Sequence, residues 1–106
     1  MPPKNSKTKS TAPTLVLLVR HGKTPTTGAK LPGRAPGLHL SELGVEQAET
    51  AAARIAGLGK ARAVYASPME RTQETAAPIA KALKRKIRTE QGLLECDFGQ
   101  WTGKDL

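Results

Sequence analysis

The sequence predicts an α/β fold, a three-layer αβα arrangement around a mostly parallel sheet. The continuous apolar run 15–19 is typical of a strand buried on both faces, as strands of parallel sheets are. Two shorter stretches, 63–66 and 86–89, predict a second strand and a weaker third one. Helical patterns separate these stretches, and the alternation favours right-handed crossovers between parallel strands.

The first helix is expected to begin after Ser41. The Ser41 hydroxyl is suited to cap the helix, and Glu42 places a negative charge in its first turn, where the helix dipole favours it. Apolar residues at helical spacing predict its buried face: Val45, Ala48, Ala52 and Ile55. Gly57 and Gly59 end the pattern.

The second helix carries a stronger start signal. Ser67 is expected as its N-cap, Pro68 as its first residue, and Glu70 as the partner of Ser67 in a capping box. The residues predicted to be buried follow at helical spacing: Ala76, Ile79, Ala80 and Leu83.

Length and composition bound the possible functions. A chain of 106 residues allows one small domain, and no apolar stretch is long enough to span a membrane. A signal-peptide pattern is absent, which favours a cytoplasmic protein. The single cysteine, Cys96, excludes an internal disulfide, and with only His21 and His39 as imidazole ligands we expect no metal and no cofactor.

The formal net charge of +8 is concentrated in two segments. Residues 1–13 are rich in proline and lysine and predict a disordered basic tail ahead of a domain over 14–106. Residues 81–88 hold five basic side chains and no acid. We interpret this cluster as a solvated helix end, and expect no specific nucleic-acid partner; a nucleic-acid patch is the alternative.

Two predicted strands end in residues suited to bind an anion. The first strand runs into Arg20, His21 and Gly22, and the helix after the second strand carries Arg71 near its start. Ligands of α/β sheets lie beyond the carboxyl ends of the strands, so these side chains are expected to converge. Two guanidinium groups and a helix N-terminus form a phosphate site, and an imidazole among them is a competent nucleophile.

Four ordered sequence blocks resemble the histidine phosphatase superfamily, in its phosphoglycerate-mutase-like branch. The first block is Arg20-His21-Gly22-Lys23-Thr24. The second is Leu40-Ser41-Glu42-Leu43-Gly44 with Gln47-Ala48, and the third is Ser67 with Arg71-Thr72 and Thr75-Ala76. The fourth is Leu94-Glu95, Phe98-Gly99, Trp101 and Gly103.

The resemblance implies a role for each matching residue. His21 would be the nucleophile that forms a phosphohistidine, and Glu95 the general acid for the leaving group. Arg20 and Arg71 would bind the phosphoryl oxygens, with Thr27 at the position where the family commonly has an asparagine. No metal is implied, because the arginines supply the positive charge. The partner would be a phosphorylated small molecule.

The resemblance also implies an apparently truncated domain. The second catalytic histidine of the family lies in its C-terminal half, and His39 does not match that position. Residues 14–106 would therefore be the N-terminal part of a histidine phosphatase domain. A phosphomonoester hydrolase is favoured over a phosphoglycerate-mutase-type phosphotransferase. The alternatives from other classes are a catalytically inactive anion-binding fragment and a basic nucleic-acid-associated protein.

Overall fold

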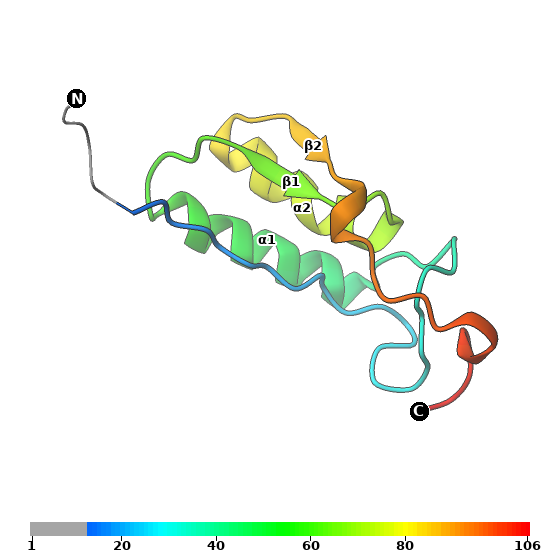
Figure 1. Ribbon diagram of the computed structural model, residues 1–106. Helices are drawn as coiled ribbons and strands as arrows, with labels where there is room; N and C mark the ends of the chain where they lie inside the picture. Colours follow the sequence, from blue (N-terminus) through cyan, green and yellow to red (C-terminus); the bar gives the residue numbers. More distant parts are fainter. Residues whose placement is uncertain (1–12) are drawn as a thin grey trace, which may run out of the picture.

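The computed structural model describes residues 13–106, as two helices and a two-stranded parallel sheet (Figure 1). In chain order these are α1 (Glu42–Ala56), β1 (Val64–Ala66), α2 (Glu70–Leu83) and β2 (Ile87–Thr89), followed by 3-10 turns at Gln91–Leu93 and Gly99–Trp101. Val64 lies opposite Ile87 in the ladder. The predicted α/β class with parallel strands is thus confirmed, whereas the predicted tail lies outside the described residues except for Pro13.

The core is built mainly from alanine. Helix α1 packs along α2, and α2 packs on both strands. The buried apolar side chains are Ala48, Ala52, Ala66, Met69, Ala76, Ile79 and Ala80. Most residues predicted to form the buried helix faces are therefore buried. The exceptions are Val45, which is exposed, and Ile55 and Leu83, which are only half-buried. Small side chains at the contact let the two helices approach closely, which leaves the larger aliphatic side chains at its margins.

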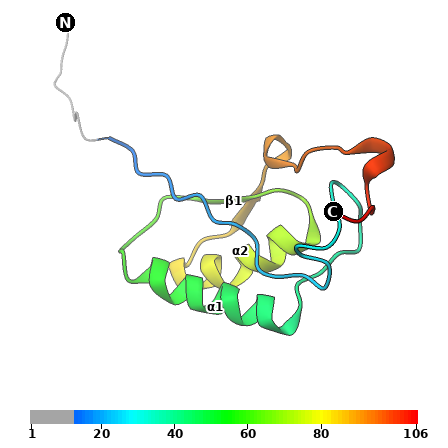
Figure 2. The same cartoon turned by 90° about the horizontal axis from the view of Figure 1, so that it is seen from below.

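The predicted first strand, 15–19, is not formed. This segment has no ladder partner among the described residues, and its side chains are exposed, up to 92% for Leu18. A continuous apolar strand needs a covering layer on each side of the sheet. Figure 2 shows α1 and α2 on the same side of β1, so residues 13–106 cover the sheet from that side alone.

The second helix begins two residues later than predicted. Its N-cap residue is Met69, without a side-chain cap, and the helix starts at Glu70. The Ser67 hydroxyl bonds instead to the Thr72 hydroxyl at 2.7 Å, and the Glu70 carboxylate accepts from Gly37 N–H at 2.9 Å. The predicted capping box is therefore wrong, because both of its side chains have other partners.

The basic cluster 81–88 spans the end of α2, the turn after it and the first two residues of β2. Arg85 Nε donates to the Ala61 carbonyl at 2.8 Å, and the Arg88 guanidinium lies over the Tyr65 ring at 5.7 Å. Part of the cluster thus has structural partners. No helix within 13–106 combines the length and apolarity needed to cross a lipid bilayer.

Candidate active site

Two glycines bring the segment after His21 into contact with the first turn of α1. A Cβ on Gly22 would meet the Gly44 backbone, and a Cβ on Gly44 would meet the Lys23 backbone. The Lys23 carbonyl accepts from Ser41 N–H at 2.8 Å, and Lys23 N–H donates to Gln47 Oε1 at 2.9 Å. The Ser41 hydroxyl caps α1 by accepting from Gly44 N–H at 3.1 Å, as predicted.

His21 is half-buried and lies in the wall of an open pocket of about 210 Å³. Its Nδ1 is 2.7 Å from the Gly22 carbonyl oxygen. A carbonyl only accepts, so in the neutral imidazole this contact places the proton on Nδ1 and leaves the lone pair on Nε2. The other residues that line the pocket are Arg20, Gly22, Gln47, Ala48, Ala51 and Thr75.

Thr75 connects the His21 segment to helix α2. Its hydroxyl oxygen accepts from Gly22 N–H at 2.9 Å and donates to the Arg71 carbonyl at 2.7 Å. The side chain is buried, so both bonds are shielded from water. Thr75 therefore ties the backbone beside His21 to helix α2, at a position one helical turn after Arg71.

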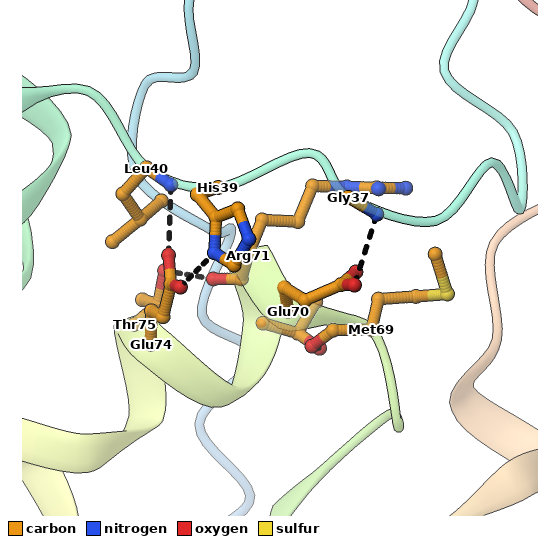
Figure 3. A network of polar contacts seen from close by, with 9 residues as sticks. Gly37, His39, Leu40, Met69, Glu70, Arg71, Glu74 and Thr75 are labelled. Atoms are coloured by element: carbon orange, nitrogen blue, oxygen red, sulfur yellow. Dashed lines mark hydrogen bonds and ion pairs between the residues drawn. The ribbon is translucent and has the colours of Figure 1, made fainter.

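The Arg71 side chain is buried and extends toward the loop 33–37 (Figure 3). Its Nη2 donates to the Gly33 carbonyl at 2.8 Å. Its Nε and Nη1 are buried and have no hydrogen-bond partner among the described residues. Two nitrogens of a buried cation whose N–H groups lack acceptors are costly, and an oxyanion would satisfy them.

Glu95 lies close to the same loop. Arg34 Nε donates to the Glu95 carbonyl at 2.8 Å, and a Cβ on Gly33 would lie 3.3 Å from the Cys96 carbonyl oxygen. The Glu95 carboxylate is exposed and accepts from Cys96 N–H at 2.8 Å. Two neighbouring residues of one loop thus have different partners: Gly33 contacts Arg71 of α2, and Arg34 contacts the backbone of Glu95.

Thr27 belongs to a tight turn after the His21 segment. Its hydroxyl accepts from Thr24 N–H at 2.8 Å and lies 2.9 Å from the Thr24 hydroxyl. Thr24 is buried and Thr27 half-buried. The Thr27 hydroxyl thus has two partners within its own turn.

Two carboxylates of α2 hold the loop that carries Gly33. Glu70 accepts from Gly37 N–H at 2.9 Å, and Glu74 accepts from Leu40 N–H at 2.8 Å and pairs with His39 Nδ1 (Figure 3). The hydrogen bond to Glu74, followed by the charge of Glu74, raises the pKa of His39. Burial raises the pKa of Glu74, but its bonds to His39 and Leu40 outweigh burial and lower that pKa overall.

The structure brings together some of the predicted residues. Arg20 and His21 share one pocket, whereas Arg71 is not among its lining residues and contacts Gly33. Sequence reasoning assigned no part in the site to several residues that organise it: Gly33, Gln47, Glu70, Glu74 and Thr75. Glu70 was expected only as a helix-capping partner of Ser67. Gln47, Glu74 and Thr75 lie within or beside the sequence blocks quoted above, which is the signal that could have singled them out. Residues 13–106 contain no cluster of three metal-ligating side chains.

Comparisons with known proteins show which family this chain resembles. The model of the histidine phosphatase superfamily (branch 1) matches residues 16–106. A bifunctional protein of Mycobacterium tuberculosis is 40% identical over 93 residues, which are 86% of this chain and 25% of that protein. Phosphoserine phosphatase 1 of Hydrogenobacter thermophilus is 34% identical, over 83% of this chain and 41% of the relative.

Solved structures show the same fold. A mycobacterial glucosyl-3-phosphoglycerate phosphatase superposes with a TM-score of 0.72 at 30% identity, over 80% of this chain and 40% of that one. A phosphoserine phosphatase from Entamoeba histolytica, in complex with 3-phosphoglyceric acid, gives 0.68 at 32% identity, over 78% and 40%. The chain therefore spans between a quarter and about two fifths of these relatives.

Proposed function

This chain belongs to the histidine phosphatase superfamily (branch 1), and on that basis we propose that it carries the phosphoryl-accepting part of a phosphomonoester hydrolase. His21 is the nucleophile, Arg20 and Arg71 bind the phosphoryl group, and Glu95 is the general acid. The observation that carries this proposal is the contact of His21 Nδ1 with the Gly22 carbonyl, because it leaves the Nε2 lone pair for attack on phosphorus.

The reaction proceeds in two steps. The Nε2 lone pair of His21 attacks phosphorus, the P–O ester bond breaks, and the leaving oxygen takes a proton from the Glu95 carboxyl. Water then attacks phosphorus, the P–N bond breaks with its electron pair returning to Nε2 of His21, inorganic phosphate leaves, and a proton from that water returns to Glu95. The guanidinium groups of Arg20 and Arg71 stabilise the negative charge on the phosphoryl oxygens, and Thr27 offers them a further hydroxyl donor.

The substrate class is a phosphorylated small molecule. Structural neighbours were solved with inorganic phosphate, with 3-phosphoglyceric acid and with phosphoserine, which supports this class for the present chain. Phosphatase names predominate among the similar solved structures. The curated relatives include both phosphoserine phosphatase 1 and a phosphoglycerate mutase of Thermoplasma acidophilum, which is 32% identical over 85% of this chain. Hydrolysis is therefore preferred to phosphotransfer. The cytoplasm as the compartment stays a prediction from the sequence.

The test is the chemical identity of the phosphorylated residue. The 106-residue chain is incubated with acetyl phosphate or an aryl phosphate, and the adduct is followed by mass spectrometry and ³¹P NMR. We expect one phosphoryl group that survives alkali and is lost in acid. The modification is expected to disappear in His21→Asn and to be present in His39→Asn, which removes the only other histidine.

Two outcomes would contradict this proposal. A phosphoryl group on the His21→Asn chain would place the nucleophile elsewhere. Sulfate or phosphate binding that depends on Arg20 and Arg71, with no adduct from any donor, would instead favour the catalytically inactive anion-binding alternative.

A further inference from the structure

The guanidinium group of Arg71 is enclosed within the protein. Arg71 is 1% exposed, and its Nε and Nη1 are buried without an acceptor. Its remaining contact, from Nη2, is to the carbonyl of Gly33 in the loop 33–40. A phosphoryl group cannot reach these two donors in this arrangement, because no solvent-accessible surface remains on them.

The loop 33–40 is fastened to α2 on both sides of Arg71. One turn of the helix separates Glu70 from Glu74, and Arg71 lies between them in sequence (Figure 3). Glu70 binds the backbone of Gly37, and Glu74 binds Leu40 N–H and the His39 ring. These three contacts, which we call the latch, keep the loop in place although it leaves a buried cation with unpaired donors.

We propose that the loop 33–40 is a lid over Arg71, held closed by the latch, and that it must open before an oxyanion can bind Arg71. The proposal rests on the role of Arg71 in the proposed function. Opening exchanges the Gly33 carbonyl for the oxygens of a phosphoryl group. The closed state therefore lowers the apparent affinity for the anion by the fraction of molecules that are open.

A lid and a structural support predict opposite effects of mutation. If the latch keeps Arg71 closed, Glu74→Ala opens the lid and tightens anion binding by about threefold to tenfold, the range expected from losing a partly exposed ion pair and its hydrogen bond. If the latch only supports the fold, the same change weakens binding. Glu49→Ala is the matched control, because Glu49 is exposed on α1.

The experiment is a titration of the ¹⁵N-labelled chain with inorganic sulfate, which stays dianionic across the neutral range. We expect Glu74→Ala to lower the sulfate Kd and Glu49→Ala to leave it unchanged. In the Arg71→Met background, Glu74→Ala is expected to have no effect on that Kd, because the lid then covers no anion site. Sulfate is also expected to speed hydrogen exchange at the Gly37 and Leu40 amides, which donate to the latch.

The outcomes separate the lid from the proposed function. If Arg71→Met weakens sulfate binding but Glu74→Ala weakens it too or leaves it unchanged, the lid is wrong while Arg71 keeps its role. If Arg71→Met alone leaves the sulfate Kd unchanged, the assignment of Arg71 as a phosphoryl ligand is wrong, and the lid proposal is rejected with it.

Discussion

Gly22 and Gly44 lie in backbone contact, with no room for a side chain between the His21 segment and helix α1. A Cβ on Gly22 would stand 3.0 Å from the Gly44 Cα and closer still to its carbonyl oxygen. The two glycines come from different sequence blocks, 22 residues apart. Their joint requirement explains why glycine occupies both positions, one after the proposed nucleophile and the other in the first turn of α1.

Gly44→Ala is expected to destabilise the protein. Alanine favours a helix over glycine by about 1 kcal/mol, but overpacking of a well-packed contact costs roughly 1–3 kcal/mol. The Lys23 backbone, 2.9 Å from the added Cβ at its nitrogen, has no flexible end that could yield. Urea unfolding followed by circular dichroism measures the effect. Gly57→Ala is the control, because its Cβ would meet nothing closer than 3.4 Å; equal midpoints for the two variants would contradict the argument.

Thr75→Val is expected to slow phosphorylation of His21. Valine has nearly the shape of threonine but leaves the Gly22 N–H without its acceptor, which costs about 1–3 kcal/mol for a buried donor. The segment that carries His21 then loses its tie to α2. Thr75→Ser keeps the hydroxyl and is expected to restore the rate of adduct formation. The interpretation fails if the valine variant reacts as fast as the parent chain.

The correct predictions came from signals that lie within short stretches of the sequence. The start of α1 followed from Ser41 and the periodicity after it, and both are complete within a few residues. The parallel pairing of 64–66 with 87–89 followed from the alternation of helix and strand patterns. The prediction of a strand over 15–19 was wrong. An apolar run indicates only that a segment favours burial, whereas a strand also needs a neighbouring strand to bond with, and that partner is not encoded in the run itself.

The candidate site shows the same division. Arg20 and His21 are adjacent in sequence, and this adjacency alone accounts for their shared pocket, because the strand expected before them is not formed. The direction of the Arg71 side chain depends on the Gly33 carbonyl, 38 residues away in a loop without regular structure. Ser67 was expected to cap α2, but its hydroxyl bonds to Thr72. Choices among such competing partners are settled by packing, and no pattern within one segment predicts them.

Ser41→Ala is expected to lower the stability of the protein by about 1 kcal/mol, the usual cost of losing an N-cap. The hydroxyl accepts from Gly44 N–H and donates to the Lys23 carbonyl at 3.1 Å, so its loss also loosens the segment after His21. Thr50→Ala, at an exposed position of α1, is the control and should be neutral or slightly stabilising. The test compares the urea midpoints of the parent chain and the two variants. A Ser41→Ala midpoint equal to that of the parent would show that the Ser41 cap does not stabilise the protein.

The pairing of His39 with Glu74 predicts how stability depends on pH. The pKa of His39 is raised above its ordinary value of 6.5, so its protonated form stabilises the folded state. This contribution is complete below the ordinary value and is lost as the pH rises through the raised pKa. Glu74, whose pKa is lowered, contributes above its ordinary value of 4.5, so it stays ionised throughout this window.

Urea midpoints measured from pH 5.5 to pH 9 test this pH dependence. The parent chain is expected to lose stability relative to His39→Gln as the pH rises, and the two curves should converge at alkaline pH, where His39 is neutral in both the folded and unfolded states. Glu74→Gln removes the partner and should flatten the same part of the profile. Parallel curves for the parent and His39→Gln across the whole range would show that the pair contributes nothing to folding.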